Sequence, residues 1–169
     1  MIVRAEEDED RAAIHALTGA AFDGHPHSDG SEPAIIERLR QAGVLSASFV
    51  AEEDGAVIGH IAFSPVGIEN GAEGWFGLGP ISVLPAWQGR GIGSSLTKKG
   101  LDWFKETGAA GCVLAGDPHF YERFGFRADA ALTLQDCAPQ YFLALPLSSA
   151  PAFGMVTYHP AFYGGSERA

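Results

Sequence analysis

Apolar residues recur with a helical period in the first part of the chain. Between Asp8 and Phe22 they appear every three to four positions, which predicts an amphipathic helix with acidic residues in its first turn. Pro33 opens a second helix that Gly43 ends. Its core-facing positions are predicted to be Ile35, Ile36, Leu39 and Ala42. Residues 1–4 suggest a short strand before both helices.

The pattern then changes to the period of β-strands. Residues 48–53 and 56–63 flank Asp54-Gly55, a two-residue turn signal that predicts a hairpin. A glycine-rich link leads to a further strand at residues 75–83. The first half therefore reads β-α-α-β-β-β, and we expect its last three strands to be antiparallel.

The second half begins with a helix that runs to about Thr107 and ends at Gly108. Residues 111–115 are wholly apolar, which favours a strand buried on both faces and parallel to its neighbour. Asp117-Pro118 predicts the start of a brief helix, followed by a turn into a strand near Phe126 and another strand at residues 141–147. An aromatic tail with many glycines and prolines follows at residues 150–164.

Composition narrows the possible partners. The chain has 169 residues, 46% of them hydrophobic, and a formal net charge of −10. Such an acidic surface disfavours nucleic acid and anionic membranes, and it suits a cationic small molecule. No apolar run approaches the ~20 residues that span a bilayer, so we expect a cytoplasmic protein. Cys112 and Cys137 are too few for a disulfide framework or a zinc site.

The segment from Gln88 to Gly93, QGRGIG, lies between a predicted strand and a predicted helix. Glycines allow close approach to the backbone, and a helix N-terminus offers unpaired amides, so this arrangement favours a phosphate group. A P-loop would need a lysine directly after the second glycine of G-x-x-x-x-G, and no lysine follows a glycine with that spacing here. A dinucleotide fingerprint would need different glycine spacing and a parallel strand before it. The pattern Q-x-x-G-x-G fits as written.

With GPISVLPAWQGRGIGSSL and the later GDPHFYERFGF, the sequence resembles the GNAT superfamily of N-acetyltransferases, in particular its bacterial YhbS-like members. The resemblance covers roughly residues 1–147. It implies an α/β fold with a mostly antiparallel, splayed sheet and helices on both faces. Residues 1–147 would form the acetyltransferase domain, and residues 148–169 would be a C-terminal extension that packs on it.

The resemblance also implies a role for each matching residue. Acetyl-CoA would be the co-substrate, with no metal required. Tyr121 matches the tyrosine that faces the acetyl-CoA sulfur, and the amide of Val83 or a neighbour would stabilise the oxyanion. The implied cofactor-binding residues are Ile81, Ser82 and Val83 on the strand that binds the pantetheine arm, and Gln88, Gly89, Arg90, Gly91, Ile92, Gly93 and Ser94 at the pyrophosphate.

The general base stays unassigned. Some family members carry a glutamate early in the cofactor strand, but residues 75–79 contain no acid. Glu53, Glu73 and His60 are alternatives that spacing does not separate. His25 and His27 lie two positions apart, but their surroundings indicate a polar loop rather than a metal site. The resemblance implies that this loop borders the acceptor site.

The resemblance predicts transfer of an acetyl group from acetyl-CoA to a primary amine of a small molecule or peptide by direct attack. Two other functions remain open: a non-catalytic acyl-CoA-binding module, and a nucleotide- or dinucleotide-binding protein. The aromatic tail would pack on the domain, close the acceptor pocket or join two chains, so a homodimer also remains open.

Overall fold

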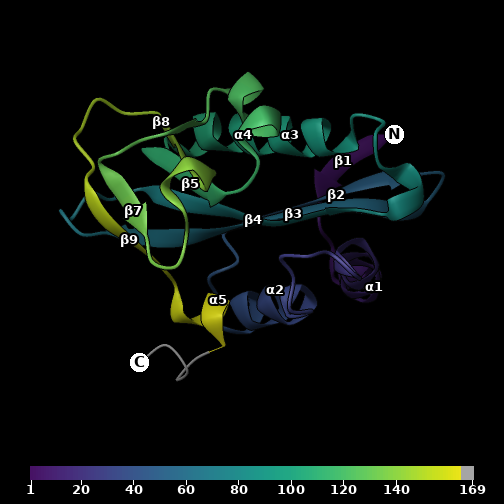
Figure 1. Cartoon of the computed structure of the whole chain (residues 1–169). Coiled ribbons are helices and arrows are strands. Elements are labelled where there is room, and N and C mark those ends of the chain that lie inside the picture. Colours follow the sequence, from purple (N-terminus) through teal and green to yellow (C-terminus); the bar gives the residue numbers. More distant parts are fainter. Residues whose placement is uncertain (165–169) are drawn as a thin grey trace.

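The computed structural model describes residues 1–164 as a twisted sheet between two layers of helices (Figure 1). Helices α1 and α2 lie on one side of the sheet, and α3 and α4 lie on the other. The strands are β1 (Ile2–Ala5), β2 (Ala47–Glu53), β3 (Ala56–Ile68), β4 (Trp75–Val83), β5 (Gly111–Ala115), β6 (Arg127–Ala128), β7 (Leu132–Leu134), β8 (Phe142–Pro146) and β9 (Gly154–Tyr158). The helices are α1 (Arg11–Phe22), α2 (Glu32–Gln41), α3 (Ile92–Thr107), α4 (Pro118–Tyr121) and α5 (Pro160–Tyr163).

The strand order in the main path of the sheet is β1-β2-β3-β4-β5-β8-β6. Neighbours β1 to β4 pair antiparallel, whereas β4 and β5 pair parallel across the α3 crossover. Strand β9 pairs with the end of β3, and β7 pairs with β9. The sheet is thus mixed and mostly antiparallel, as predicted.

The β2–β3 hairpin turns at the predicted pair, with φ of 51° at Asp54 and 79° at Gly55. Strand β3 is longer than predicted, because it continues to Ile68 rather than ending at Phe63. Pro65 and Gly67, which lie beyond Phe63, are residue types that weaken strands. The structure keeps this segment extended because its last three residues bond to β9, which the local sequence does not reveal.

Helices α1 and α2 bury one face each, as predicted. Ile14 and Leu17 of α1 are buried, and so are Ile35, Ile36 and Leu39 of α2. Ala42 was wrongly assigned to the core. The helix ends one residue earlier, Ala42 caps it in the solvent, and Gly43 takes a φ of 72° that ends the helix.

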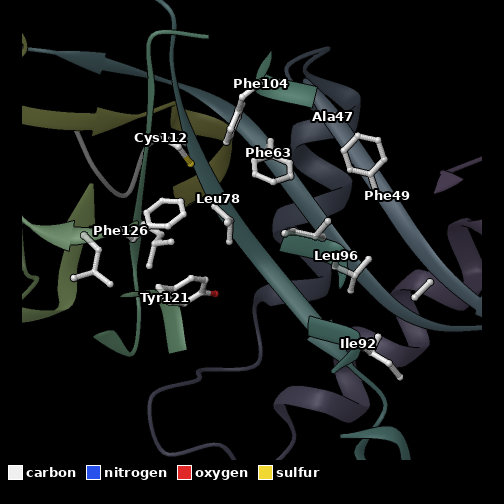
Figure 2. Packing of buried hydrophobic residues seen from close by; sticks show 14 of the residues in the cluster. Ala47, Phe49, Phe63, Leu78, Ile92, Leu96, Phe104, Cys112, Tyr121 and Phe126 are labelled. Carbon is white, nitrogen blue, oxygen red and sulfur yellow. The ribbon is translucent and has the colours of Figure 1, made fainter. Parts of the chain in front are cut away.

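Helix α3 forms the other layer and packs on a core that is rich in aromatic rings (Figure 2). Ile92, Leu96, Gly100 and Phe104 face the sheet. The Phe63 ring lies 5.2 Å from the Phe104 ring, centroid to centroid, in an edge-to-face arrangement. This packing fixes the N-terminus of α3 relative to β4, because both belong to the same cluster.

The C-terminal part of the described chain is held on the α2 side of the sheet. Arg38 of α2 donates from Nε to the carbonyl of Ala161 at 2.8 Å. In Figure 1, α5 lies beside α2 and below the sheet.

The strand predicted after Phe126 is only two residues long, and β7 was not predicted at all. Within residues 1–164, no helix has the length and apolar character needed to cross a membrane.

Candidate functional site

Strands β4 and β5 part in the middle of the sheet. Their register pairs are Trp75 with Gly111, Phe76 with Cys112, and Gly77 with Val113, and the pairing stops there. Strand β4 nevertheless continues to Val83, bonded to β3 on its other side. Beyond Gly77, β4 therefore has no strand paired with it on the β5 side, which leaves a gap in the sheet.

The backbone of Ile81 and Val83 borders this gap. The amide of Leu84 donates to the carbonyl of Ile58 on β3 at 2.9 Å. Because backbone groups alternate sides along a strand, Ser82 also faces β3, whereas Ile81 and Val83 face away from it. In agreement, the Val83 carbonyl accepts a hydrogen bond from Gln88 Nε2 at 3.0 Å. The side chain of Ser82 lies 3.2 Å from Thr18 of α1, Oγ to Oγ1.

The QGRGIG segment forms the turn between β4 and α3. Gly89 and Gly91 take φ values of 77° and 80°, a left-handed conformation that glycine adopts without strain. Gly91 is the N-cap of α3 and has no side chain to cap the helix. The first amides of an α-helix have no carbonyl partner within the helix, so the amides that begin at Ile92 are open to an anion.

Two further residues of this turn were predicted to bind the cofactor. The Arg90 guanidinium lies 4.8 Å from the centroid of the Trp87 ring, a cation–π contact on the surface of the turn. Gly93 lies under Phe120 of α4, since a Cβ placed there would be 3.5 Å from the ring. Residue 93 thus brings α4 close to the start of α3.

Tyr121, the predicted catalytic residue, ends α4 and belongs to the same core cluster as Leu78 and Cys112. Asp117 caps α4 by accepting from the amide of His119 at 2.9 Å, which confirms the predicted helix start. The Tyr121 ring is 5.8 Å from that of Phe126. Figure 2 shows the hydroxyl pointing away from Phe126.

The Tyr121 hydroxyl has an open position for a ligand. It makes no hydrogen bond within residues 1–164, and the residue is 7% exposed. Burial of the ring raises the pKa of Tyr121 above its usual value, with a smaller contribution from Cys112. The phenol is therefore protonated at neutral pH and can donate a hydrogen bond.

The three alternatives for a general base lie in different places. Glu53 pairs with the N-terminal amino group of Met1 at 2.7 Å, and Glu73 is exposed in the β3–β4 loop. His60 is opposite Ser82 in the β-ladder but is completely buried. Burial lowers the pKa of His60 to about 3, so its ring is neutral. The arrangement brings none of the three onto the β4 edge of the gap.

His60 is part of a buried polar chain that the sequence did not reveal. Its Nε2 lies 2.7 Å from Ser48 Oγ, and Ser48 in turn donates to Glu6. Glu6 pairs with Arg40 at 2.8 Å. Since the Ser48 hydroxyl proton goes to the carboxylate, His60 must donate from Nε2, which leaves its Nδ1 an unpartnered acceptor.

The loop between α1 and α2 lines a cavity of about 380 Å³. Its walls include Phe22, Asp23, His25 and Glu32. The rings of His25 and His27 are 6.0 Å apart, centroid to centroid. In the described part of the chain, no three His, Cys, Asp or Glu side chains are grouped so that they could hold a metal ion.

Sequence reasoning also missed one side chain near the gap, Tyr158 of β9. Its ring packs directly against the backbone of Gly77. The glycine at position 77, inside a strand, was the available signal, because such glycines often mark a close approach by another group.

Comparison with known proteins agrees with this architecture. The model of the acetyltransferase (GNAT) family matches residues 10–126. An uncharacterized N-acetyltransferase of Escherichia coli, YhbS, is 38% identical over 131 residues, which are 77% of this chain and 75% of that protein.

Two crystal structures carry the likeness further. A GNAT family acetyltransferase from Brucella melitensis in complex with acetyl-CoA is 46% identical and superimposes with a TM-score of 0.85, covering 95% of this chain and 97% of the other. YhbS from Escherichia coli in complex with CoA gives a TM-score of 0.87 at 32% identity, covering 96% of this chain and 91% of the other. The chain belongs to the GNAT family of acetyltransferases.

Proposed function

We propose that this protein transfers the acetyl group of acetyl-CoA to a primary amine of a small molecule or peptide by direct attack. The observation that carries the proposal is the gap between β4 and β5, which has open helix amides at one end and the unpartnered Tyr121 hydroxyl beside it. An extended ligand with a phosphate group fits this arrangement. The crystal structures of the Brucella and Escherichia coli relatives with acetyl-CoA and CoA support it.

The residues of the turn would hold the pyrophosphate. Amides from Gly89 to Ser94 would donate to phosphate oxygens, helped by the partial positive charge at the start of α3. Arg90 would add a charge-assisted contact. Ile81 and Val83 would bond the pantetheine arm through their backbone, and Gln88 would keep the turn joined to β4. Ser82 would support the strand through its contact with Thr18.

The chemistry requires little beyond positioning. The neutral amine nitrogen attacks the thioester carbon, an amide bond forms, the carbon–sulfur bond breaks, and the amine loses a proton to a base or a water chain. The amide of Val83 or of a neighbour on β4, whichever is not bonded to the pantetheine arm, would stabilise the oxyanion. Tyr121 would donate a hydrogen bond to the departing sulfur, and the thiolate would take up the proton that the amine released, through the base or the water chain, and leave as the thiol of CoA. The products are an N-acetylated amine and CoA.

Calorimetric titration with acetyl-CoA tests binding, with NAD as the control. We expect acetyl-CoA to bind in the micromolar range and NAD not to compete. Transfer is then measured on a panel of primary amines: a polyamine, an aminoglycoside, lysine and a short peptide with a free N-terminus. The acidic surface favours the cationic members of this panel.

Tyr121→Phe tests the mechanism. We expect this variant to keep the acetyl-CoA affinity, because the hydroxyl has no partner within residues 1–164 to lose. We expect kcat to fall at least about tenfold, because the departing sulfur loses its hydrogen-bond donor. Equal turnover in both proteins would remove Tyr121 from the mechanism. Tight acetyl-CoA binding without transfer to any amine would instead indicate a non-catalytic acyl-CoA-binding module, and preference for NAD would indicate a dinucleotide-binding protein.

A further inference from the structure

The C-terminal strand β9 brings Tyr158 to the point where the gap opens. Tyr158 is opposite Val66 in the ladder between β9 and β3. Its ring lies over Gly77, so that a Cβ at position 77 would be 2.5 Å from the ring atom Cε2. Gly77 and Val113 form the last register pair between β4 and β5. Tyr158 therefore stands at the closed end of the gap.

Tyr121 and Tyr158 approach this point from opposite faces of the sheet. Tyr121 packs in the cluster that contains Cys112, whereas Tyr158 packs in the cluster that contains Val113. Successive side chains of a strand point to opposite faces, so Cys112 and Val113 of β5 separate the two clusters. Burial raises the pKa of Tyr158, so its hydroxyl is protonated at neutral pH.

The Tyr158 hydroxyl resembles that of Tyr121 in its surroundings. The residue is only 5% exposed, yet within residues 1–164 its hydroxyl makes no hydrogen bond. Buried polar groups in proteins are generally hydrogen-bonded, so a buried hydroxyl without a partner in the protein is available to a ligand.

The position of Tyr158 is fixed from three sides. Phe162 packs against it, with the ring centroids 4.8 Å apart and the ring planes tilted by 56°. Arg38 holds the following helix through the carbonyls of Ala161 and Phe162, at 2.8 and 3.4 Å. The missing side chain at Gly77 makes room for the ring. A tyrosine held this firmly presents its hydroxyl in one place, as a binding residue must.

We propose that Tyr158 is an acceptor-binding residue: its hydroxyl oxygen accepts a hydrogen bond from the incoming amine, on the face of the gap opposite Tyr121. This inference rests on the proposed acetyl transfer. If Tyr121 serves the departing sulfur from one face, the nucleophile has the other face free, and Tyr158 is a polar side chain that the fold places on that other face. The tail thereby takes part in acceptor recognition.

The first experiment reports position without requiring a known acceptor. The chain has four tyrosines, and incorporation of 3-fluorotyrosine gives each a fluorine resonance that single Tyr→Phe variants assign. Spectra are recorded with CoA and with acetyl-CoA, two ligands that differ only by the acetyl group. We expect the resonances of Tyr121 and Tyr158 to differ between the two complexes, and that of Tyr141, which is 50% exposed, to stay unchanged.

The second experiment reports the role. Tyr158→Phe and the control Tyr141→Phe are compared on the best amine of the panel. We expect Tyr158→Phe to raise the KM for the amine at least about fivefold, as loss of one hydrogen bond would do, and to leave the KM for acetyl-CoA and the Tm unchanged. Tyr121→Phe should instead lower kcat, so the two tyrosines are distinguished by the parameter that changes.

Each outcome has a definite meaning. A Tyr158 resonance that is identical in both complexes, while that of Tyr121 differs, would overturn the placement of Tyr158 beside the acetyl group. An unchanged amine KM in Tyr158→Phe would overturn its role in acceptor binding. Absence of any acetyl-CoA binding would defeat the proposed function and this inference together, and calorimetry on the unmodified protein identifies that case.

Discussion

The ring of Phe63 on β3 fills the space that a side chain at Gly100 of α3 would need: a Cβ there would lie 2.2 Å from the ring atom Cζ. Gly100 therefore lets α3 approach the sheet closely, even though glycine weakens a helix interior. This contact fixes the distance between α3, whose N-terminus begins the proposed phosphate site, and β4, which borders the gap.

The first prediction concerns Gly100→Ala. Alanine favours the helix by about 1 kcal/mol, but we expect a net loss of about 1–3 kcal/mol in the free energy of unfolding, because Phe63 is completely buried and cannot move aside. Urea denaturation measures it. Gly19→Ala in α1, where the nearest atom would be 3.9 Å away, is the control and should be neutral or stabilising. Equal stability of the two variants would show that the α3–sheet contact can relax.

The second prediction concerns Gly91→Ala. Its φ of 80° strains any other residue, so in the free variant the turn should relax to another conformation. Binding of acetyl-CoA must then restore the original conformation, which costs affinity. We expect acetyl-CoA affinity to fall at least about tenfold by calorimetry. Gly43→Ala at the end of α2 has a similar φ of 72° and open space around it, so it should cost similar stability and no affinity. Equal affinities would mean that the turn does not bind the cofactor.

The third prediction concerns pH and His60. Burial lowers the pKa of the folded His60 to about 3 from the ordinary 6.5, with Arg40 as a smaller cause and Asp10 opposing it. Between these values the unfolded chain binds a proton that the folded chain does not, so stability falls as the pH falls below 6.5. Each pH unit costs about 1.4 kcal/mol, or about 2 kcal/mol between pH 6.5 and pH 5.

His60→Gln should remove this part of the pH dependence, measured as urea unfolding at pH 7 and pH 5. His15→Gln, on the exposed side of α1, should retain it. If the difference in stability between the two pH values is the same in His60→Gln and in the unchanged protein, the buried imidazole does not cause the acid sensitivity.

The fourth prediction concerns Arg38→Gln. Loss of the guanidinium removes both hydrogen bonds to the carbonyls of α5. We expect faster hydrogen exchange in the peptide that covers residues 154–164, with little change in β4, because opening is local when few contacts hold a segment. Arg127→Gln on the exposed β6 is the control. If residues 154–164 exchange at the same rate in Arg38→Gln and in Arg127→Gln, the pairing of β9 alone holds the tail.

The parts of the site that could be predicted from sequence depend on neighbouring residues. Gln88 to Gly93 were recognised because their glycines, the helix start and the preceding strand lie within a few positions of one another in the sequence. The structure gives two of these glycines the left-handed conformation. The α4 start at Asp117 is equally local. Residues far apart in sequence were harder. Tyr158 reaches Gly77 only through the pairing of β9 with β3, and His60 meets Glu6 only through the fold.

Beyond Gly77, β4 is an edge strand located inside a sheet rather than at its border. Exposed strand edges are templates on which other chains add and proteins aggregate, and proteins therefore shield them. Here β5, β8 and β6 continue on the far side of the gap, so a second protein chain cannot approach the edge as it would an outer strand. The fold thereby offers backbone amides to a slender ligand while denying them to another copy of itself.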